Sequence, residues 1–191
     1  MIYGATGYSG KLIVEQTVAE GLKPVLAGRS EDKVKALAAQ YDLPFMVFSI
    51  EDLAKDDGLL QGMTLVLNCA GPFSQTAAVM MEACLCQKSH YLDITGEVDV
   101  FELAASLNDT AKNAGVVLCP GVGFDVIPTD CVAAQLKQQM PDATTLTLGF
   151  DSRSGFSPGT AKTSAEAIPY GGKVRKNGVI EYVPLAYKTR K

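Results

Sequence analysis

The sequence has few of the residues that build metal sites and disulfide frameworks. It contains one histidine, His90, and five cysteines, which are Cys69, Cys84, Cys86, Cys119 and Cys131. Because their number is odd and they are scattered through apolar segments, we predict small buried side chains rather than disulfides. Cys84 and Cys86 would point to different faces of one helix, and His90 alone could join them. We therefore expect no zinc site.

Long apolar runs are also missing. No apolar stretch reaches the ~18 residues that a membrane span needs, and the first residues lack the basic and long apolar regions of a secretory signal. The composition, 47% hydrophobic and 20% charged, is typical of a soluble chain that buries a core. We therefore expect a cytoplasmic protein without an integral membrane segment.

Basic residues are scarce except at the end of the chain. The formal net charge is −4, yet residues 171–191 carry six basic side chains and one acid, Glu181. These charges are interleaved with apolar side chains, as in a solvated strand or hairpin, and the whole chain is acidic. We therefore predict a solvated surface here rather than a nucleic-acid interface.

Short apolar runs alternate with segments of helical period. The runs that predict strands are 1–3, 24–27, 44–49, 64–69, 91–94 and 116–119. The segments that predict helices are 11–22, 31–41, 75–87 and 100–114. This alternation, with strands that are apolar throughout, indicates an α/β fold: a Rossmann-type doubly wound parallel sheet with helices on both faces. Ser30 is the expected N-cap of the second helix.

The pattern changes after the sixth strand. A glycine- and proline-rich stretch leads to a predicted helix at 131–140 and an alternating, strand-like run at 144–150. We predict a Rossmann domain over 1–127 and the start of an α+β domain over 128–191. The first strand is short and the second sheet is begun but not closed, so we expect the chain to be a piece of a longer protein.

The motif GATGYSG stands at the first strand-to-helix junction. Gly4 would allow the turn, Gly7 would let the backbone approach a phosphate, and Gly10 would let the helix pack closely on the sheet. A tight turn with incidental glycines is the alternative, and the strand, turn and helix context favours a pyrophosphate site. The remaining contacts would come from the hydroxyls of Thr6 and Ser9, with Tyr8 covering the phosphates.

The end of the second strand indicates which dinucleotide binds. NAD-binding proteins hold the ribose 2′-hydroxyl with an acid at this position, whereas this chain has Gly28, Arg29 and Ser30. A guanidinium and a hydroxyl suit the 2′-phosphate of NADP, so we predict NADP and consider NAD less suited. The alternative is that Arg29 is a surface charge without a ligand.

The fourth strand ends in small residues that would let a dinucleotide lie across the sheet edge. We predict cofactor contacts by Asn68, Ala70, Gly71 and Pro72, with the last two forming a loop over the ribose or nicotinamide.

Three polar residues follow the fifth strand, and three further residues follow the sixth. Asp93, Thr95 and Glu97 would either cap the helix that starts near Val98 or take part in catalysis, and these alternatives stay open. A hinge or a substrate-facing loop would be formed by Gly121, Gly123 and Asp125.

Five motifs follow one another in the order YGATGYSGKLI, AGRS, LNCAGPFS, HYLDITGE and PGVGFDVIPTD. Over roughly residues 1–130 they resemble the saccharopine dehydrogenase-like family, which includes the saccharopine dehydrogenase-like oxidoreductases and the trans-acting enoyl reductases. The resemblance implies a NAD(P)-binding Rossmann domain, followed by an α+β domain that completes the active site and often mediates dimerisation, here as a homodimer.

The resemblance also implies which part of the cofactor each motif holds. The glycine motif would hold the pyrophosphate, Arg29 and Ser30 the adenosine phosphate, and residues 70–72 the nicotinamide side. The function that follows is NADP-dependent hydride transfer to or from a C=N, C=O or C=C group of a small-molecule substrate. Within residues 1–127 the sequence has no Tyr-x-x-x-Lys pair that would mark a short-chain dehydrogenase acid, and we assign no catalytic residue. A non-catalytic NADP-binding regulator or scaffold is the alternative.

Overall fold

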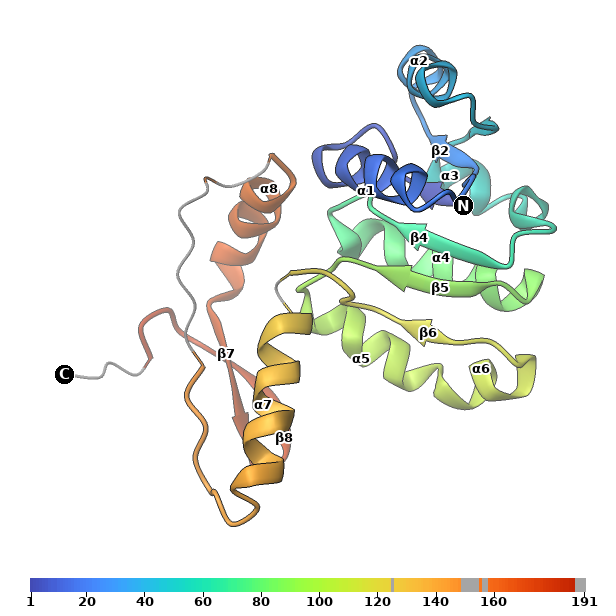
Figure 1. The fold of residues 1–191 in the computed structure, drawn as a ribbon. Coiled ribbons are helices and arrows are strands. Elements are labelled where there is room, and N and C mark those ends of the chain that lie inside the picture. The colour runs from blue at the N-terminus through green and yellow to red at the C-terminus, as the bar shows by residue number, and fades with distance from the viewer. Residues whose placement is uncertain (125, 149–154, 156–157, 188–191) are drawn as a thin grey trace. The chain divides into compact units, whose positions relative to one another are not determined.

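A computed structural model describes residues 1–124, 126–148, 155 and 158–187. The chain divides into two compact units, Met1–Asp151 and Ser152–Lys191, which are described separately below. Figure 1 gives the labels of the helices and strands.

The first unit is built on a six-stranded sheet of the order β3-β2-β1-β4-β5-β6, with every neighbouring pair parallel (Figure 1). The strands are β1 Ile2–Tyr3, β2 Leu26–Gly28, β3 Phe45–Val47, β4 Leu65–Asn68, β5 His90–Asp93 and β6 Leu118–Cys119. This order is that of a doubly wound dinucleotide-binding sheet, so the predicted fold class is confirmed. The order reverses between β1 and β4, which makes that place the switch point of the sheet.

The helices of this unit lie between the strands in the sequence, except the last one, which follows β6. They are α1 Tyr8–Ala19, α2 Glu31–Tyr41, α3 Ile50–Leu53, the 3-10 helix η1 Asp57–Leu60, α4 Phe73–Gln87, α5 Val98–Ser106, α6 Asn108–Ala114 and α7 Ile127–Gln139. Ser30 is the N-cap of α2, as predicted, although its side chain makes no capping hydrogen bond. Within the described parts of the chain, no helix combines the length and apolarity needed to cross a membrane.

The core consists of two apolar clusters on opposite faces of the sheet. In β1, Ile2 belongs to the cluster that contains residues of α1 and α2, whereas Tyr3 belongs to the cluster that contains residues of α3 and α4. Leu26 and Ala27 in β2 divide in the same way. Because successive strand residues point to opposite faces, the sheet is covered on both sides. The continuous apolar strands seen in the sequence follow from this double burial.

The cysteines are less buried than predicted. Cys84 is buried and Cys69 is partly buried, but Cys86, Cys119 and Cys131 are exposed, so the expectation of buried side chains is wrong for these three. Apolar neighbours in the sequence did not reveal that these positions face outward. All five are free thiols, and the described residues contain no metal-binding group of histidine, cysteine and acidic side chains.

The strand predicted at 144–150 is not formed over its described residues, 144–148. Leu146 and Leu148 remain about half exposed there. Alternation of apolar side chains produces a strand only when a second strand supplies hydrogen bonds. Within the described parts of the chain, no strand pairs with this segment. The helix predicted just before it is present as α7.

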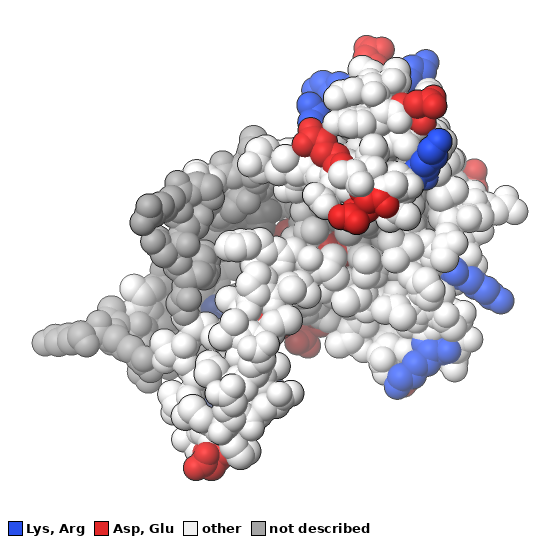
Figure 2. Space-filling model, in the orientation of Figure 1, with Lys and Arg blue, Asp and Glu red and all other residues white. Residues whose placement is uncertain are grey.

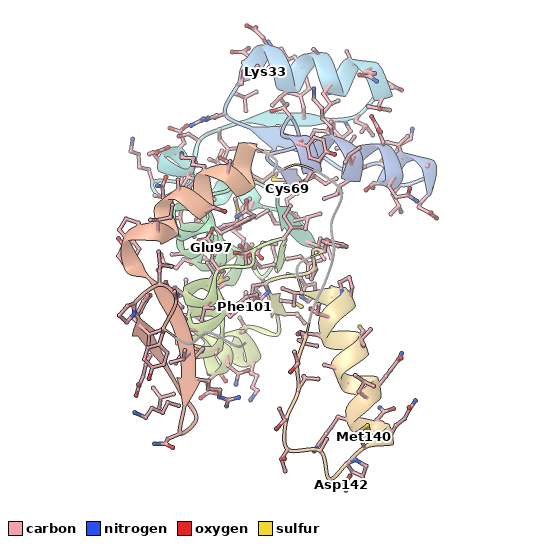
Figure 3. All side chains as sticks on the ribbon, turned by 90° about the vertical axis from the view of Figure 1, so that its left-hand side faces the viewer. Lys33, Cys69, Glu97, Phe101, Met140 and Asp142 are labelled. Carbon is pink, nitrogen blue, oxygen red and sulfur yellow. The ribbon has the colours of Figure 1, made fainter. Side chains whose placement is uncertain are left out.

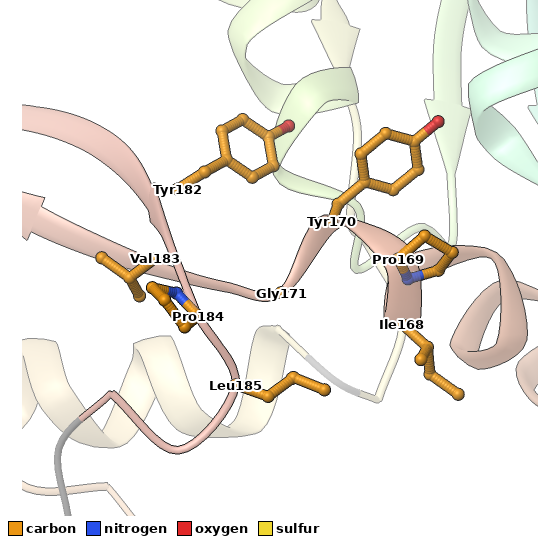
Figure 4. Close-up of a pocket in the computed structure, with 8 residues that line it drawn as sticks. All are labelled: Ile168, Pro169, Tyr170, Gly171, Tyr182, Val183, Pro184 and Leu185. Carbon is orange, nitrogen blue, oxygen red and sulfur yellow. The ribbon is translucent and has the colours of Figure 1, made fainter.

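The second unit contains α8 Pro158–Ala167, the 3-10 helix η2 Ile168–Tyr170, and a hairpin of β7 Gly172–Lys176 and β8 Val179–Val183. Asn177 and Gly178, predicted to form a turn, join the two strands with φ values of 51° and 84°. Such a turn matches the twist of a hairpin. Figure 4 shows the open hollow between η2 and the end of β8, lined by Tyr170, Tyr182 and their neighbours.

Charged side chains do not form one continuous basic area on the face that Figure 2 shows. Acidic and basic residues are interspersed over the α2 region of that face. In the hairpin, the ammonium of Lys173 lies 4.8 Å from the centre of the Tyr182 ring, which is a cation–π contact. Most hairpin side chains are exposed, in line with the solvated strand that the sequence indicated.

We expect Gly10→Ala to destabilise the first unit. A Cβ at Gly10 would lie 2.3 Å from the carbonyl oxygen of Gly4, and backbone atoms cannot rotate away as a flexible side chain can. The loss should be about 1–3 kcal/mol in the free energy of unfolding, which exceeds the gain in helix propensity from alanine. Thermal and urea unfolding measure the change. Lys11→Ala, at the next and exposed position of α1, is the control, and equal effects of both substitutions would contradict the packing described.

The thiols should differ in their rates of labelling by a disulfide reagent near neutral pH. Burial raises the pKa of Cys69 and of Cys84 to about 12, so both stay protonated, and the thiolate is the reactive form. A hydrogen bond to a carboxylate of η1 raises the pKa of the exposed Cys86. Cys119 and Cys131 should therefore react first, with Cys69 and Cys84 last. Peptide mapping after timed labelling measures the order, and early modification of Cys84 would contradict it.

Candidate functional site

The glycine turn lies in direct contact with the loop that follows β4. Gly4 has φ +77°, which L side chains rarely adopt, and a Cβ there would lie 2.9 Å from the backbone nitrogen of Ala70. The turn therefore requires glycine for two reasons, its conformation and the nearby backbone. This contact lies at the switch point between β1 and β4, where open α/β sheets bind their ligands.

Helix α1 begins directly after this turn. Gly7 is its N-cap and supplies no capping side chain. The N–H groups of Tyr8, Ser9 and Gly10 form the first turn, where amides have no acceptor within the helix. The Tyr8 side chain is 69% exposed, while Thr6 and Ser9 are half-buried. This helix end combines free N–H groups with the positive end of the helix dipole, which is an arrangement that can hold an anion.

The loop of residues 69–72 is held by the buried Asn68. The Oδ1 atom of Asn68 accepts a hydrogen bond from the Ala70 N–H at 3.0 Å, and its Nδ2 atom donates to the Thr76 hydroxyl at 3.1 Å. That hydroxyl donates to the Ala70 carbonyl at 2.8 Å. Hydrogen bonds therefore fix both the N–H group and the carbonyl group of Ala70. Gly71 is exposed and precedes Pro72 through a cis peptide bond.

The tip of β2 carries Arg29 and Ser30 at the same edge of the sheet. Arg29 is exposed, and the Ser30 hydroxyl is not used as a helix cap. Glu51 of α3 lies close enough for its carboxylate and the Arg29 guanidinium to influence each other electrostatically. Sequence reasoning missed this acid, because Glu51 comes 22 residues later and reaches the site only through the pairing of β2 with β3. Burial, with a smaller contribution from Glu51, raises the pKa of Tyr3 to about 12.

Asp93 is the acceptor of a buried hydrogen-bond network. Its carboxylate accepts from the Tyr91 hydroxyl at 2.6 Å, from the Thr95 N–H at 3.0 Å and from the Gly121 N–H at 2.8 Å. Burial, then the nearby Asp93, raises the pKa of Tyr91, so its hydroxyl remains a donor. Of the two alternatives left open for Asp93, these contacts favour a structural role, since the carboxylate ties β5 to the loop after β6.

Glu97 caps a different helix from the one that the sequence indicated. It stands at the N-cap position of α5, as expected for a residue just before Val98, but its side chain makes no capping bond there. Its carboxylate accepts instead from the N–H groups of Phe73 and Ser74, at the start of α4. Figure 3 shows Glu97 and Cys69 among the side chains at the loop edge of the sheet. Thr95 uses its hydroxyl to accept the Glu97 N–H.

The loop after β6 also approaches its neighbours closely. Gly121 has φ +75°, and a Cβ there would lie 2.5 Å from the Cε1 atom of Phe101 in α5. A Cβ at Gly123 would lie 3.1 Å from the Ile94 side chain. Asp125, the third residue predicted in this loop, lies outside the described residues.

The structure therefore brings the glycine turn and residues 69–72 into contact, and it places Arg29 and Ser30 one strand further along the same edge. The exposed guanidinium of Arg29, the open N-terminus of α1 and the loop that approaches Gly4 follow β2, β1 and β4, and along the sheet edge they fit the successive parts of a dinucleotide. The sequence-predicted contacts with a cofactor stay predictions.

Comparisons with known proteins give a family and a fold. Residues 1–119 match the family model described as saccharopine dehydrogenase NADP binding domain. The saccharopine dehydrogenase-like oxidoreductase of Rattus norvegicus is 28% identical in an alignment of 160 residues, and the match covers 73% of this chain and 37% of that protein. A trans-acting enoyl reductase of Mycobacterium bovis is 27% identical in an alignment of 183 residues, and the match covers 88% of this chain and 44% of that protein.

A solved structure is similar in fold. The apo saccharopine dehydrogenase (L-Glu forming) from Saccharomyces cerevisiae is 16% identical, with a TM-score of 0.64 over 96% of this chain and 43% of that one. The chain thus spans about two fifths of the length of these relatives. The family model matches well over half of the sequence, and the chain belongs to the saccharopine dehydrogenase NADP-binding domain family.

Proposed function

We propose that this chain binds NADP(H) across the carboxyl edge of its sheet, as the dinucleotide-binding part of an oxidoreductase. The contact between the turn at Gly4 and the loop at Ala70 carries the proposal, because it brings a phosphate-binding helix end and a second loop to one switch point. The pyrophosphate lies at the N–H groups of Ser9 and Gly10, with Thr6 and Tyr8 beside it. Gly7 gives the backbone room for this approach.

The 2′-phosphate of NADP lies against Arg29 and Ser30. Arg29 offers a planar guanidinium with several donors, and the Ser30 hydroxyl is left unused by its helix. Glu51 is the nearby acid, and it lies on α3 rather than at the tip of β2, where an NAD-binding acid is found. These features favour NADP over NAD.

The nicotinamide lies over residues 70–72, and the hydrogen bond of Asn68 to Ala70 holds this loop in place. The bound cofactor supplies hydride for the reduction of a C=N, C=O or C=C group of a small molecule. The names of the relatives, a saccharopine dehydrogenase-like oxidoreductase and an enoyl reductase, support this range without selecting one member. In the complete protein, residues 1–127 hold the cofactor, and residues 128–191 begin the α+β domain for the substrate and for a homodimer contact.

Turnover separates this proposal from that of a cofactor-binding regulator. The complete protein should consume NADPH with at least one substrate of a panel of enoyl, imine and keto compounds, followed at the absorbance of the reduced nicotinamide. Tight binding of NADPH without turnover of any of them would favour the regulator instead.

We expect Arg29→Ala to weaken NADPH binding by about 10- to 100-fold while leaving NADH binding unchanged. The reason is the loss of charged hydrogen bonds to a phosphate that NADH does not have. Titration of the cofactor fluorescence measures both affinities. Lys33→Ala is the matched control, since Lys33 is an exposed cation in the first turn of α2 (Figure 3) and has no contact with the cofactor in the proposal.

Two results would contradict the assignment of this site. One is an Arg29→Ala variant that binds NADPH as tightly as the original chain. The other is an original chain that binds NADH more tightly than NADPH.

A further inference from the structure

The N-terminus of α4 is already occupied by a carboxylate of the chain itself. The Oε1 atom of Glu97 accepts the Phe73 N–H at 2.9 Å, and its Oε2 atom accepts the Ser74 N–H at 2.7 Å. Both oxygens of one side chain thus bind consecutive amides across 24 and 23 residues of sequence. Helix α4 begins directly after Pro72, so this cap holds one end of the loop of residues 69–72.

Glu97 is itself held from the sheet. Its N–H donates to the Thr95 hydroxyl at 3.0 Å, and the Thr95 N–H donates to the buried Asp93 carboxylate at 3.0 Å. Asp93 is the last residue of β5 and is fully buried. Successive hydrogen bonds therefore connect Glu97, which caps α4, to the end of β5.

The other end of the loop is fixed independently. Asn68 and Thr76 bind the N–H and carbonyl groups of Ala70, as described above. The loop is thus fastened at Ala70 and again at Phe73, which leaves Gly71 exposed between two fixed points. A loop held in this way needs little further ordering when a ligand binds on it.

The two helix ends at this edge differ in their electrostatics. The first turn of α1 has no acidic residue and no capping side chain, whereas the first turn of α4 carries the negative charge of Glu97. A helix N-terminus attracts one anion, and a carboxylate already bound there repels another. The phosphates of a dinucleotide are therefore directed to α1, and the uncharged nicotinamide ribose is left for the loop at α4.

We propose, on the basis of the function proposed above, that Glu97 is a positioning residue for the nicotinamide half of NADP(H). It fastens residues 69–72 in the conformation on which the nicotinamide ribose lies, and its charge excludes phosphate from the start of α4. It acts through the loop and has no contact of its own with the reacting atoms.

The test compares NADPH with 2′-phospho-ADP, which has every phosphate of the cofactor but neither the nicotinamide nor the ribose that carries it. Glu97→Gln keeps the shape of the side chain, but its amide nitrogen faces an N–H donor and its charge is gone. We expect an affinity about tenfold lower for NADPH and an unchanged affinity for 2′-phospho-ADP, both measured by isothermal titration calorimetry. Glu102→Gln is the control, because Glu102 is an exposed acid on the same helix, and it should change neither affinity.

An equal loss for both ligands, or a loss for neither, would overturn the role of Glu97. If Glu97→Gln does not fold, Thr95→Val serves the same purpose, because it removes the acceptor of the Glu97 N–H at nearly constant shape. It should give the same selective loss for NADPH. Failure of the unsubstituted chain to bind either ligand would contradict the proposed function instead, so the two outcomes are distinct.

Discussion

The contact between Gly4 and Ala70 is the constraint on which the rest of the site depends. The turn after β1 can approach the loop after β4 only because Gly4 has no side chain and adopts a positive φ. Gly10 then allows α1 to lie against that turn, with its ideal Cβ position only 2.3 Å from the Gly4 carbonyl oxygen. A phosphate-binding helix end and the loop of residues 69–72 are thereby brought to one edge, which neither could provide alone.

A buried polar framework keeps this edge in place. Asn68 and Asp93 are paired in register on adjacent strands, and both are fully buried at the ends of β4 and β5. Buried polar atoms are costly unless they are hydrogen-bonded, and among the described residues every buried side-chain nitrogen or oxygen has a partner. Three of their hydrogen bonds come from loop N–H groups, those of Ala70, Thr95 and Gly121. Because Asn68 and Asp93 are held in the sheet, their hydrogen bonds fix the conformations of the loops that follow β4 and β5.

Local signals in the sequence predicted the fold and the glycine turn. The apolar strand runs, the helical segments between them and the turn at Gly4 are each determined by residues close together in the sequence. They also predicted the N-cap position of Ser30 and the turn at Asn177. They did not predict that Glu97 caps α4 or that Arg29 and Glu51 come within electrostatic range of each other, because both interactions join segments more than 20 residues apart through the closing of the sheet. The predicted strand at 144–150 failed over residues 144–148 for a related reason, since pairing depends on a partner that a local pattern does not specify.

The central claim is that a dinucleotide crosses from Arg29, over the start of α1, to residues 69–72. A crystal structure of the chain with NADPH tests it most directly. The account predicts pyrophosphate oxygens within about 3 Å of the N–H groups of Ser9 and Gly10, with the 2′-phosphate at Arg29 and the nicotinamide ribose beside Gly71. A cofactor bound in the reverse direction, or with its phosphates at the start of α4, would contradict it.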